Sequence, residues 1–181
     1  MKKFCITFLL SGIIILSALG VFSGAFGMQN GSANTEYLRI HIRANSNEGE
    51  DQAVKYLVRD AVVAYLTPIV AETETREEAE AALDDCLPGL VQTAEQVLEK
   101  NGFFYGARAE IREEEFPTRV YGEYTLEAGV YRALIVSLGT GTGDNWWCVV
   151  YPPLCFAGEP GDSVVYRSKI LEIIRSWKKN H

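Results

Sequence analysis

The first 27 residues divide the chain into two parts that cannot share one folded domain. Lys2 and Lys3 precede a run, residues 4–27, that contains no charged side chain. A basic start, a long apolar run and small residues at its end are the components of an export signal. The run is also close to the length that spans a bilayer. We therefore expect residues 1–27 to be either a cleaved signal peptide or a retained membrane anchor with its basic end inside.

The remainder of the chain is acidic. Residues 28–36 are rich in Asn, Gly and Ser and predict a short linker, so that residues 37–181 are expected to form a single exported domain. Beyond residue 27 the chain has 15 basic and 24 acidic residues, a net charge of −9. This charge argues against nucleic-acid binding and against membrane attachment through basic patches. Membrane contact is expected only through residues 4–27, if they are not cleaved.

The first half of the expected domain has one strand pattern and three helical patterns. Residues 37–43 alternate strictly, which predicts a half-buried strand with Leu38, Ile40 and Ile42 on its buried face. A helix is expected from residue 48, after a capping cluster, to Pro68. A capping box at Thr75 predicts a short helix that ends near residue 86, and Pro88 is suited to the first turn of a third helix.

The second half of the domain changes to a period of two. Residues 107–111 and 130–138 have strand patterns, and the glycine-rich residues 139–144 predict a turn into a return strand over residues 145–151, as in a β-hairpin. A last amphipathic helix is expected around residues 166–177. The order β-α-α-α-β-β-β-α predicts a single α+β domain, with helices packed on a mainly antiparallel sheet of about four strands.

Cys148 and His41 are the residues that could form a nucleophile and its base. A catalytic cysteine needs a nearby imidazole or other cation, and the second histidine is the C-terminal His181. We favour the simpler interpretation, in which Cys148 packs in a strand and His41 lies on a sheet face. The alternative is an exported cysteine-dependent hydrolase that acts on the cell wall.

The other motifs do not indicate a phosphate-binding, calcium or zinc site. The glycines of residues 139–143 lead into a strand, whereas a phosphate-binding loop leads into a helix. The acidic stretches lack the ligand spacing of a calcium site, and no zinc motif is present. We expect no catalytic residue, metal, cofactor or small-molecule substrate. Cys148 and Cys155 flank Pro152-Pro153, and two interpretations stay open for them: a disulfide formed outside the cytoplasm, or two free thiols.

Two adjacent tryptophans are the most unusual feature of the chain. Trp146 and Trp147 lie on one predicted strand and must point to opposite faces of the sheet. If the sheet is covered on one face, one ring fills the core and the other is partly exposed, as in contact hot spots. If helices cover both faces, both rings are buried.

These residues resemble a known family, the stage II sporulation protein R of endospore-forming bacteria. The resemblance is strongest over residues 116–138 and 145–156, which contain Asn-Trp-Trp-Cys and Pro-Pro-Leu-Cys-Phe. A second stretch comprises residues 41–46 (His-Ile-Arg-Ala-Asn-Ser), Asp51-Gln52 and residues 58–62. Together they cover about residues 36–156. Glu127 stands where this family commonly has Pro, which affects a turn only.

The resemblance implies a signal and not an enzyme. Members are made in the forespore and exported into the space between the two sporulation membranes. There they activate a membrane-embedded protease of aspartic type, which processes the precursor of sigma factor E in the mother cell. The outer portion of that protease is therefore the expected partner. The candidate partner-binding residues are Trp146, Trp147, Asn145, Tyr151, Phe156, His41, Asn45, Arg59 and Asp60.

Overall fold

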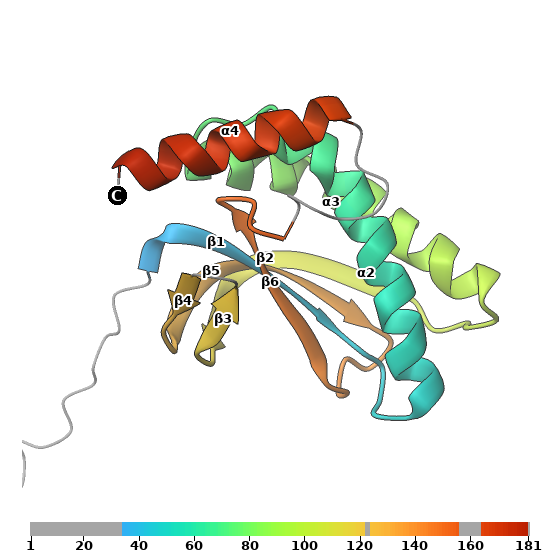
Figure 1. The fold of residues 1–181 in the computed structure, drawn as a ribbon. Coiled ribbons are helices and arrows are strands. Elements are labelled where there is room, and N and C mark those ends of the chain that lie inside the picture. Colours follow the sequence, from blue (N-terminus) through green and yellow to red (C-terminus); the bar gives the residue numbers. More distant parts are fainter. Residues whose placement is uncertain (1–33, 122–123, 156–163, 181) are drawn as a thin grey trace, which may run out of the picture. The chain divides into compact units, whose positions relative to one another are not determined.

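The computed structural model describes residues 34–121, 124–155 and 164–180, which form helices packed on a sheet (Figure 1). The predicted export segment, most of the linker, and Phe156 lie outside the described residues. Within the described part, no helix combines the length and apolar character needed to cross a membrane. The helices are α2 (Gly49–Val70), α3 (Arg76–Lys100) and α4 (Val164–Asn180); the strands are β1 (Asn34–Arg43), β2 (Ala107–Phe116), β3 (Arg119–Tyr121), β4 (Tyr124–Leu126), β5 (Gly129–Leu138) and β6 (Asn145–Tyr151).

The predicted α+β class is confirmed. The main sheet has the order β2-β5-β1-β6, with β2 antiparallel to β5 and β6 antiparallel to β1. The central pair β1 and β5 is parallel. β3 and β4 pair only with each other, as a separate two-stranded sheet.

The predicted hairpin between β5 and β6 is wrong, because β1 lies between these two strands. The glycine-rich connection instead crosses the end of β1. The N–H of Gly143 donates to the Ala44 carbonyl oxygen across 3.0 Å. A Cβ atom at Gly143 would overlap the Ser46 carbonyl, and Gly139 has a φ of +55°. The glycines therefore allow a close crossover instead of a tight turn.

The two helices predicted on either side of Pro88 form one continuous helix, α3. Leu83, before this proline, and Leu90, after it, are both fully buried on the same side of the helix. A proline removes one hydrogen bond and disfavours a helix interior. Here the apolar stripe on both sides of Pro88 packs against the core, and this packing outweighs the local preference. Pro68 likewise lies inside the last turn of α2.

β1 is buried on both faces, although its alternation predicted burial on one. Leu38, Ile40 and Ile42 belong to the core cluster that the helices cover. On the opposite face Arg39 and His41 have 0% and 1% of their surface exposed. A second core cluster of Phe116, Tyr131, Ala133 and Ile135 lies on that face, with Trp147 packed against it. The sheet therefore has two cores, a large one under the helices and a small aromatic one.

Candidate partner-binding surface

The structure does not support Cys148 and His41 as a catalytic pair. Cys148 pairs with Ile40 in the sheet and belongs to the core under the helices. His41 is the next residue of β1, so its side chain points to the opposite face of the sheet. Its ring lies 4.7 Å from the ring of Trp147 and 5.4 Å from that of Phe116. The sheet itself separates the thiol sulfur from the imidazole.

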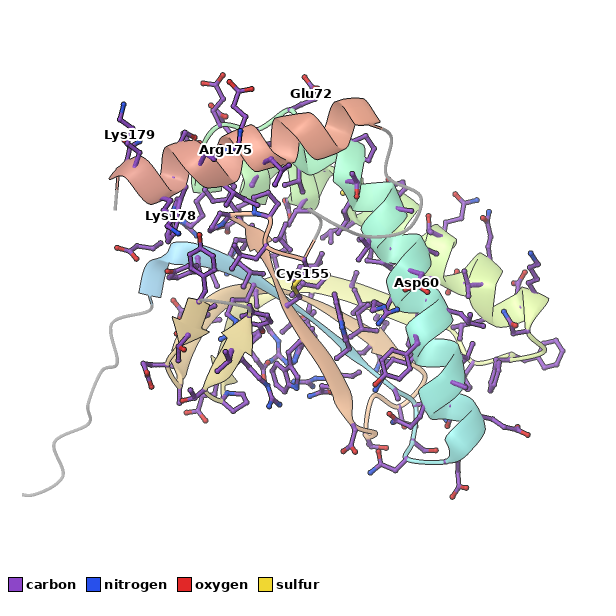
Figure 2. The ribbon with its side chains drawn as sticks, in the orientation of Figure 1. Asp60, Glu72, Cys155, Arg175, Lys178 and Lys179 are labelled. Carbon is purple, nitrogen blue, oxygen red and sulfur yellow. A yellow bond between two sulfur atoms is a disulfide. The ribbon has the colours of Figure 1, made fainter. Side chains whose placement is uncertain are left out.

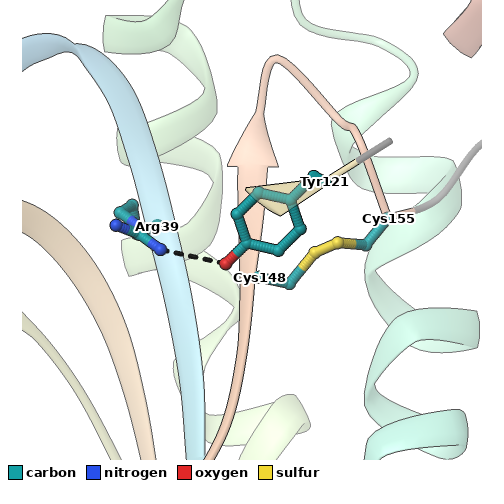
Figure 3. The surroundings of a disulfide bond; sticks show 4 residues. All are labelled: Arg39, Tyr121, Cys148 and Cys155. Atoms are coloured by element: carbon teal, nitrogen blue, oxygen red, sulfur yellow. Dashed lines mark hydrogen bonds between the residues drawn. A yellow bond between two sulfur atoms is a disulfide. The ribbon is translucent and has the colours of Figure 1, made fainter. Parts of the chain in front are cut away.

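The sulfur of Cys148 is also engaged. Cys148 and Cys155 form a disulfide with their Cα atoms 6.3 Å apart (Figure 3). This bond closes a short loop over Pro152-Pro153, directly after β6. A disulfide-bonded cysteine has no thiolate to act as a nucleophile. Cys86 is the free cysteine among the described residues, and burial raises the pKa of its thiol.

The imidazole of His41 is neutral at physiological pH. Burial, together with the positive charges of Arg43, Arg112 and Arg39, lowers its pKa from 6.5 to about 3. Among the described residues, neither ring nitrogen of His41 has a hydrogen-bond partner. His41 is therefore a packed core residue, and its burial keeps it from touching a partner directly.

Trp147 is half-buried at the edge of this aromatic core. Its ring lies 4.8 Å from that of Phe116, in an edge-to-face arrangement. The guanidinium carbon of the exposed Arg119 lies 5.5 Å from the centroid of the same ring. This distance is within the range of a cation–π contact. Trp147 thus joins the core to an exposed cation on β3.

Trp146 is also half-buried, but on the helix-covered face. Arg59 of α2 places its guanidinium carbon 5.9 Å from the Trp146 ring and 5.1 Å from that of Tyr56. Tyr56 has 45% of its surface exposed, and Asp60, also exposed, lies on the same helix, α2 (Figure 2). Arg59 also makes an ion pair of 2.5 Å with Asp60.

The structure matches neither of the two alternatives that the sequence left open for the tryptophans. The two rings do point to opposite faces, but each is half-buried and neither is a fully covered core residue. The reason is the position of β6 at the edge of the sheet, where its first residues have neighbours on one side only.

Two other candidate residues have structural roles. Tyr151 is 6% exposed, and its hydroxyl donates to the Glu74 carbonyl oxygen. Burial raises the pKa of this hydroxyl. Asn45 accepts from the Thr140 N–H through its side chain and so holds the crossover connection. Neither presents its side chain as a contact surface.

Asn45 belongs to a partly buried hydrogen-bond network at the start of α2. The Asp51 carboxylate accepts hydrogen bonds from Asn45 (2.8 Å), Ser46 (2.6 Å) and Tyr105 (2.6 Å). Burial alone would raise the pKa of Asp51, but these bonds hold it below its usual value. Lys55, 1% exposed, donates to Gln52 and to the Asp144 carbonyl oxygen. Part of the family resemblance therefore lies in residues that connect β1, α2 and the crossover by hydrogen bonds, namely residues 45, 46, 51 and 52.

Tyr56 and Arg119 lie at this site but are absent from the candidate residues that the sequence suggested. Tyr56 stands three residues before Arg59, a spacing that places both side chains on one side of a helix. The sequence could therefore have indicated Tyr56. No local pattern indicates Arg119, because its approach to Trp147 depends on how β3 lies against the sheet. The residues around the first part of β6, on both faces of the sheet, are called here the tryptophan surface: Asn145, Trp146, Trp147, Tyr56, Arg59 and Arg119.

Within residues 34–121, 124–155 and 164–180, no group of three His, Cys, Asp or Glu side chains could hold a metal ion. The tryptophan surface contains aromatic rings and arginines but no buried nucleophile and no acid–base pair. Such a composition is typical of protein contact sites, where Trp, Tyr and Arg contribute most of the binding energy.

Comparison with known proteins identifies the family of the chain. The family model described as stage II sporulation protein R matches residues 34–160. The chain is 39% identical over 119 residues to the stage II sporulation protein R of Bacillus subtilis (strain 168), an alignment that covers 66% of this chain and 53% of that protein. It therefore spans about half the length of this relative. No solved structure matches the chain. On the family match and this identity, the chain belongs to the stage II sporulation protein R family.

Proposed function

We propose that this chain is an exported signalling protein of sporulation. It is made in the forespore and enters the space between the two sporulation membranes. There it binds the outer portion of a membrane-embedded aspartic-type protease, which then processes the precursor of sigma factor E in the mother cell. Residues 1–27 direct its export and are either removed or kept as an anchor.

Family membership supports a role in sporulation. The observation that carries the rest of the proposal is the tryptophan surface. It gathers two partly exposed tryptophans and two arginines at one end of β6, on a domain whose candidate catalytic pair is separated by the sheet. A protein with this surface is equipped to bind another protein.

Reconstitution in a non-sporulating bacterial host tests the proposal. The host produces the protease and the sigma-factor precursor, with or without the full chain, and precursor cleavage is followed by immunoblotting. We expect cleavage only when the chain is present. Trp146→Ala should abolish it, whereas Leu171→Ala, which removes an exposed apolar side chain from α4, should leave it unchanged.

Two further variants separate signalling from other roles. Deletion of residues 1–27 should keep the chain in the cytoplasm and prevent cleavage. Replacement of both Cys148 and Cys155 by Ser should still allow precursor cleavage, provided that the variant is folded. A cysteine hydrolase would instead lose all activity. Cleavage without the chain, or release of cell-wall fragments by the purified protein, would contradict the proposal.

The fate of the N-terminal segment is measured on the same material. Intact-mass analysis of the protein recovered outside the cytoplasm should show loss of about the first 25 residues if a signal peptidase acts at the end of the apolar run. Recovery of only a full-length membrane species would identify the segment as an anchor.

A further inference from the structure

The two edges of the main sheet differ in chemistry. β2, at one edge, carries Arg108, Glu110 and Arg112, followed by three consecutive glutamates. Charged side chains of this kind protect an edge strand against pairing with another chain. β6, at the other edge, contains no charged residue. Only β6 therefore lacks charge protection.

The edge of β6 is accessible along its first part only. Cys148, Val149 and Val150 have no exposed surface, and the loop closed by the Cys148–Cys155 disulfide follows directly after Tyr151. The three residues Asn145, Trp146 and Trp147 are half-buried and keep part of their surface exposed. In an antiparallel ladder, alternate residues direct their N–H and C=O groups away from the paired strand. The open segment thus offers backbone groups that β1 does not use.

Asn145 supplies an independent sign of a missing neighbour. Its side-chain oxygen is buried and has no hydrogen-bond donor in the part of the chain that the structure describes. Buried polar atoms are nearly always paired, because an unpaired acceptor costs its full desolvation energy. A donor from an added chain at this end of β6 would satisfy it after a change of rotamer.

Positive charge lies on both sides of this open segment. Arg59 reaches Trp146 from the helix-covered face, and Arg119 reaches Trp147 from the other face. Arg59 is paired with Asp60, its neighbour in the chain, and among the described residues no ion pair holds Arg119. The chain as a whole has a net charge of −7, so two arginines here form a local exception.

We propose that residues Asn145–Trp147 of β6 receive an extended, acidic segment of the partner as an added β-strand, with its carboxylates directed to Arg59 and Arg119. This inference rests on the proposed function and specifies the chemistry of the partner. Strand addition obtains affinity from backbone hydrogen bonds and specificity from the flanking side chains. The charged edge of β2 would repel the same segment, so the site is confined to β6.

A second copy of this chain fits the site less well. Two β6 edges paired about a two-fold axis would place the arginines of each copy near those of the other, and like charges across a strand pair are destabilising. An acidic segment replaces that repulsion by attraction. The expected occupant of the site is therefore a different protein and not a second copy of this chain.

The experiment measures binding of the full chain to the purified outer portion of the protease and follows amide hydrogen exchange in the complex. We expect exchange at residues 145–147 to slow by about tenfold or more on binding. Arg59→Glu and Arg119→Glu should each weaken affinity by about tenfold or more, with a loss that shrinks as salt is raised. Arg175→Glu makes the same charge change on the exposed side of α4 and should have no effect (Figure 2).

Thermal melting establishes that each variant is folded, and Arg119, which is exposed on β3, keeps the test valid if Arg59→Glu is unstable. If the wild type binds the protease and triggers cleavage, and both Arg59→Glu and Arg119→Glu do so equally well, the inference is overturned and the proposed function stays intact. Equal loss in all three reversals, or a dimer that protects residues 145–147 without the protease, would also overturn it. Absence of any wild-type binding or cleavage would instead overturn the proposed function.

Discussion

The guanidinium group of Arg39 donates a hydrogen bond to the Tyr121 hydroxyl across 2.9 Å and so links the central strand β1 to the separate sheet of β3 and β4 (Figure 3). Arg39 has no exposed surface, and its guanidinium carbon lies 4.1 Å from the Phe116 ring and 4.7 Å from that of Tyr131. Within residues 34–121, 124–155 and 164–180, its Nε and Nη1 atoms have no hydrogen-bond partner. The cation is therefore held by aromatic rings and by one hydroxyl group.

Removal of that hydroxyl should destabilise the domain. Tyr121→Phe keeps the ring but leaves the buried guanidinium without its acceptor, which should lower the free energy of unfolding by about 1–3 kcal/mol. Urea denaturation measures the change. Tyr124→Phe is the matched control, because its hydroxyl makes no hydrogen bond among the described residues, and it should cost less than about 0.5 kcal/mol. Equal effects would show that the hydrogen bond adds nothing.

Gly143 should tolerate no side chain. In Gly143→Ala the new methyl group would overlap the Ser46 carbonyl oxygen and force the crossover away from β1. We expect a loss of about 1–3 kcal/mol in thermal or urea unfolding. Gly49→Ala, in the first turn of α2 with no atom within 4 Å of the added carbon, should be neutral or stabilise by up to about 1 kcal/mol. A stable Gly143→Ala protein would disprove the close crossover.

His41 should make the stability depend on pH. The folded state keeps His41 neutral down to about pH 3, whereas the unfolded chain binds a proton near pH 6.5. The unfolded state thus holds more protons between these values, so stability falls as the pH is lowered through this window, by about 1.4 kcal/mol per unit when the difference is fully developed.

The matched variant is His41→Phe, which keeps an aromatic ring against Trp147 and Phe116 but does not titrate. Urea unfolding of both proteins between pH 7 and pH 5 isolates the histidine, because most carboxylates titrate lower. We expect the difference in stability between variant and wild type to grow in favour of the variant as the pH falls. Parallel curves would contradict a neutral, buried His41.

The Cys148–Cys155 disulfide should be present in the exported protein. Alkylation in denaturant without a reductant should leave these two cysteines unmodified and label Cys86. The double replacement by Ser should cost up to about 2–3 kcal/mol, because the closed loop is short. Cys86→Ser serves as the control. Labelling of Cys148 and Cys155 in the exported wild type would exclude the bond.

Local elements followed from local patterns. The alternation of residues 37–43 and 130–138 and the helical spacing after residue 48 predicted β1, β5 and α2, and the capping box at Thr75 marks the N-cap of α3, where the Thr75 hydroxyl accepts from the Glu78 N–H. In these segments the side-chain period and the capping groups act within a few residues. At Pro88 the local preference predicted a break between two helices, but packing of the apolar stripe against the core keeps α3 continuous.

The candidate site was predicted only in part. The sequence identified Trp146, Trp147 and Arg59, and the geometry of a strand required the two rings to diverge. It could not tell that Tyr151 and His41 are buried, since burial depends on which elements cover each face of the sheet. It could not place Arg119 against Trp147 either, because that contact joins residues 28 positions apart.

What the sequence by itself determined was the class of the domain, the location of most of its helices and strands, and, through two specific stretches, its family. What only the tertiary structure decided was the order of the strands. Residues 139–144 favour a hairpin as strongly as a crossover, because the same glycines serve both. The choice depends on β1, about a hundred residues earlier, which gains backbone hydrogen bonds to both β5 and β6 and buries both of its faces only when it lies between them.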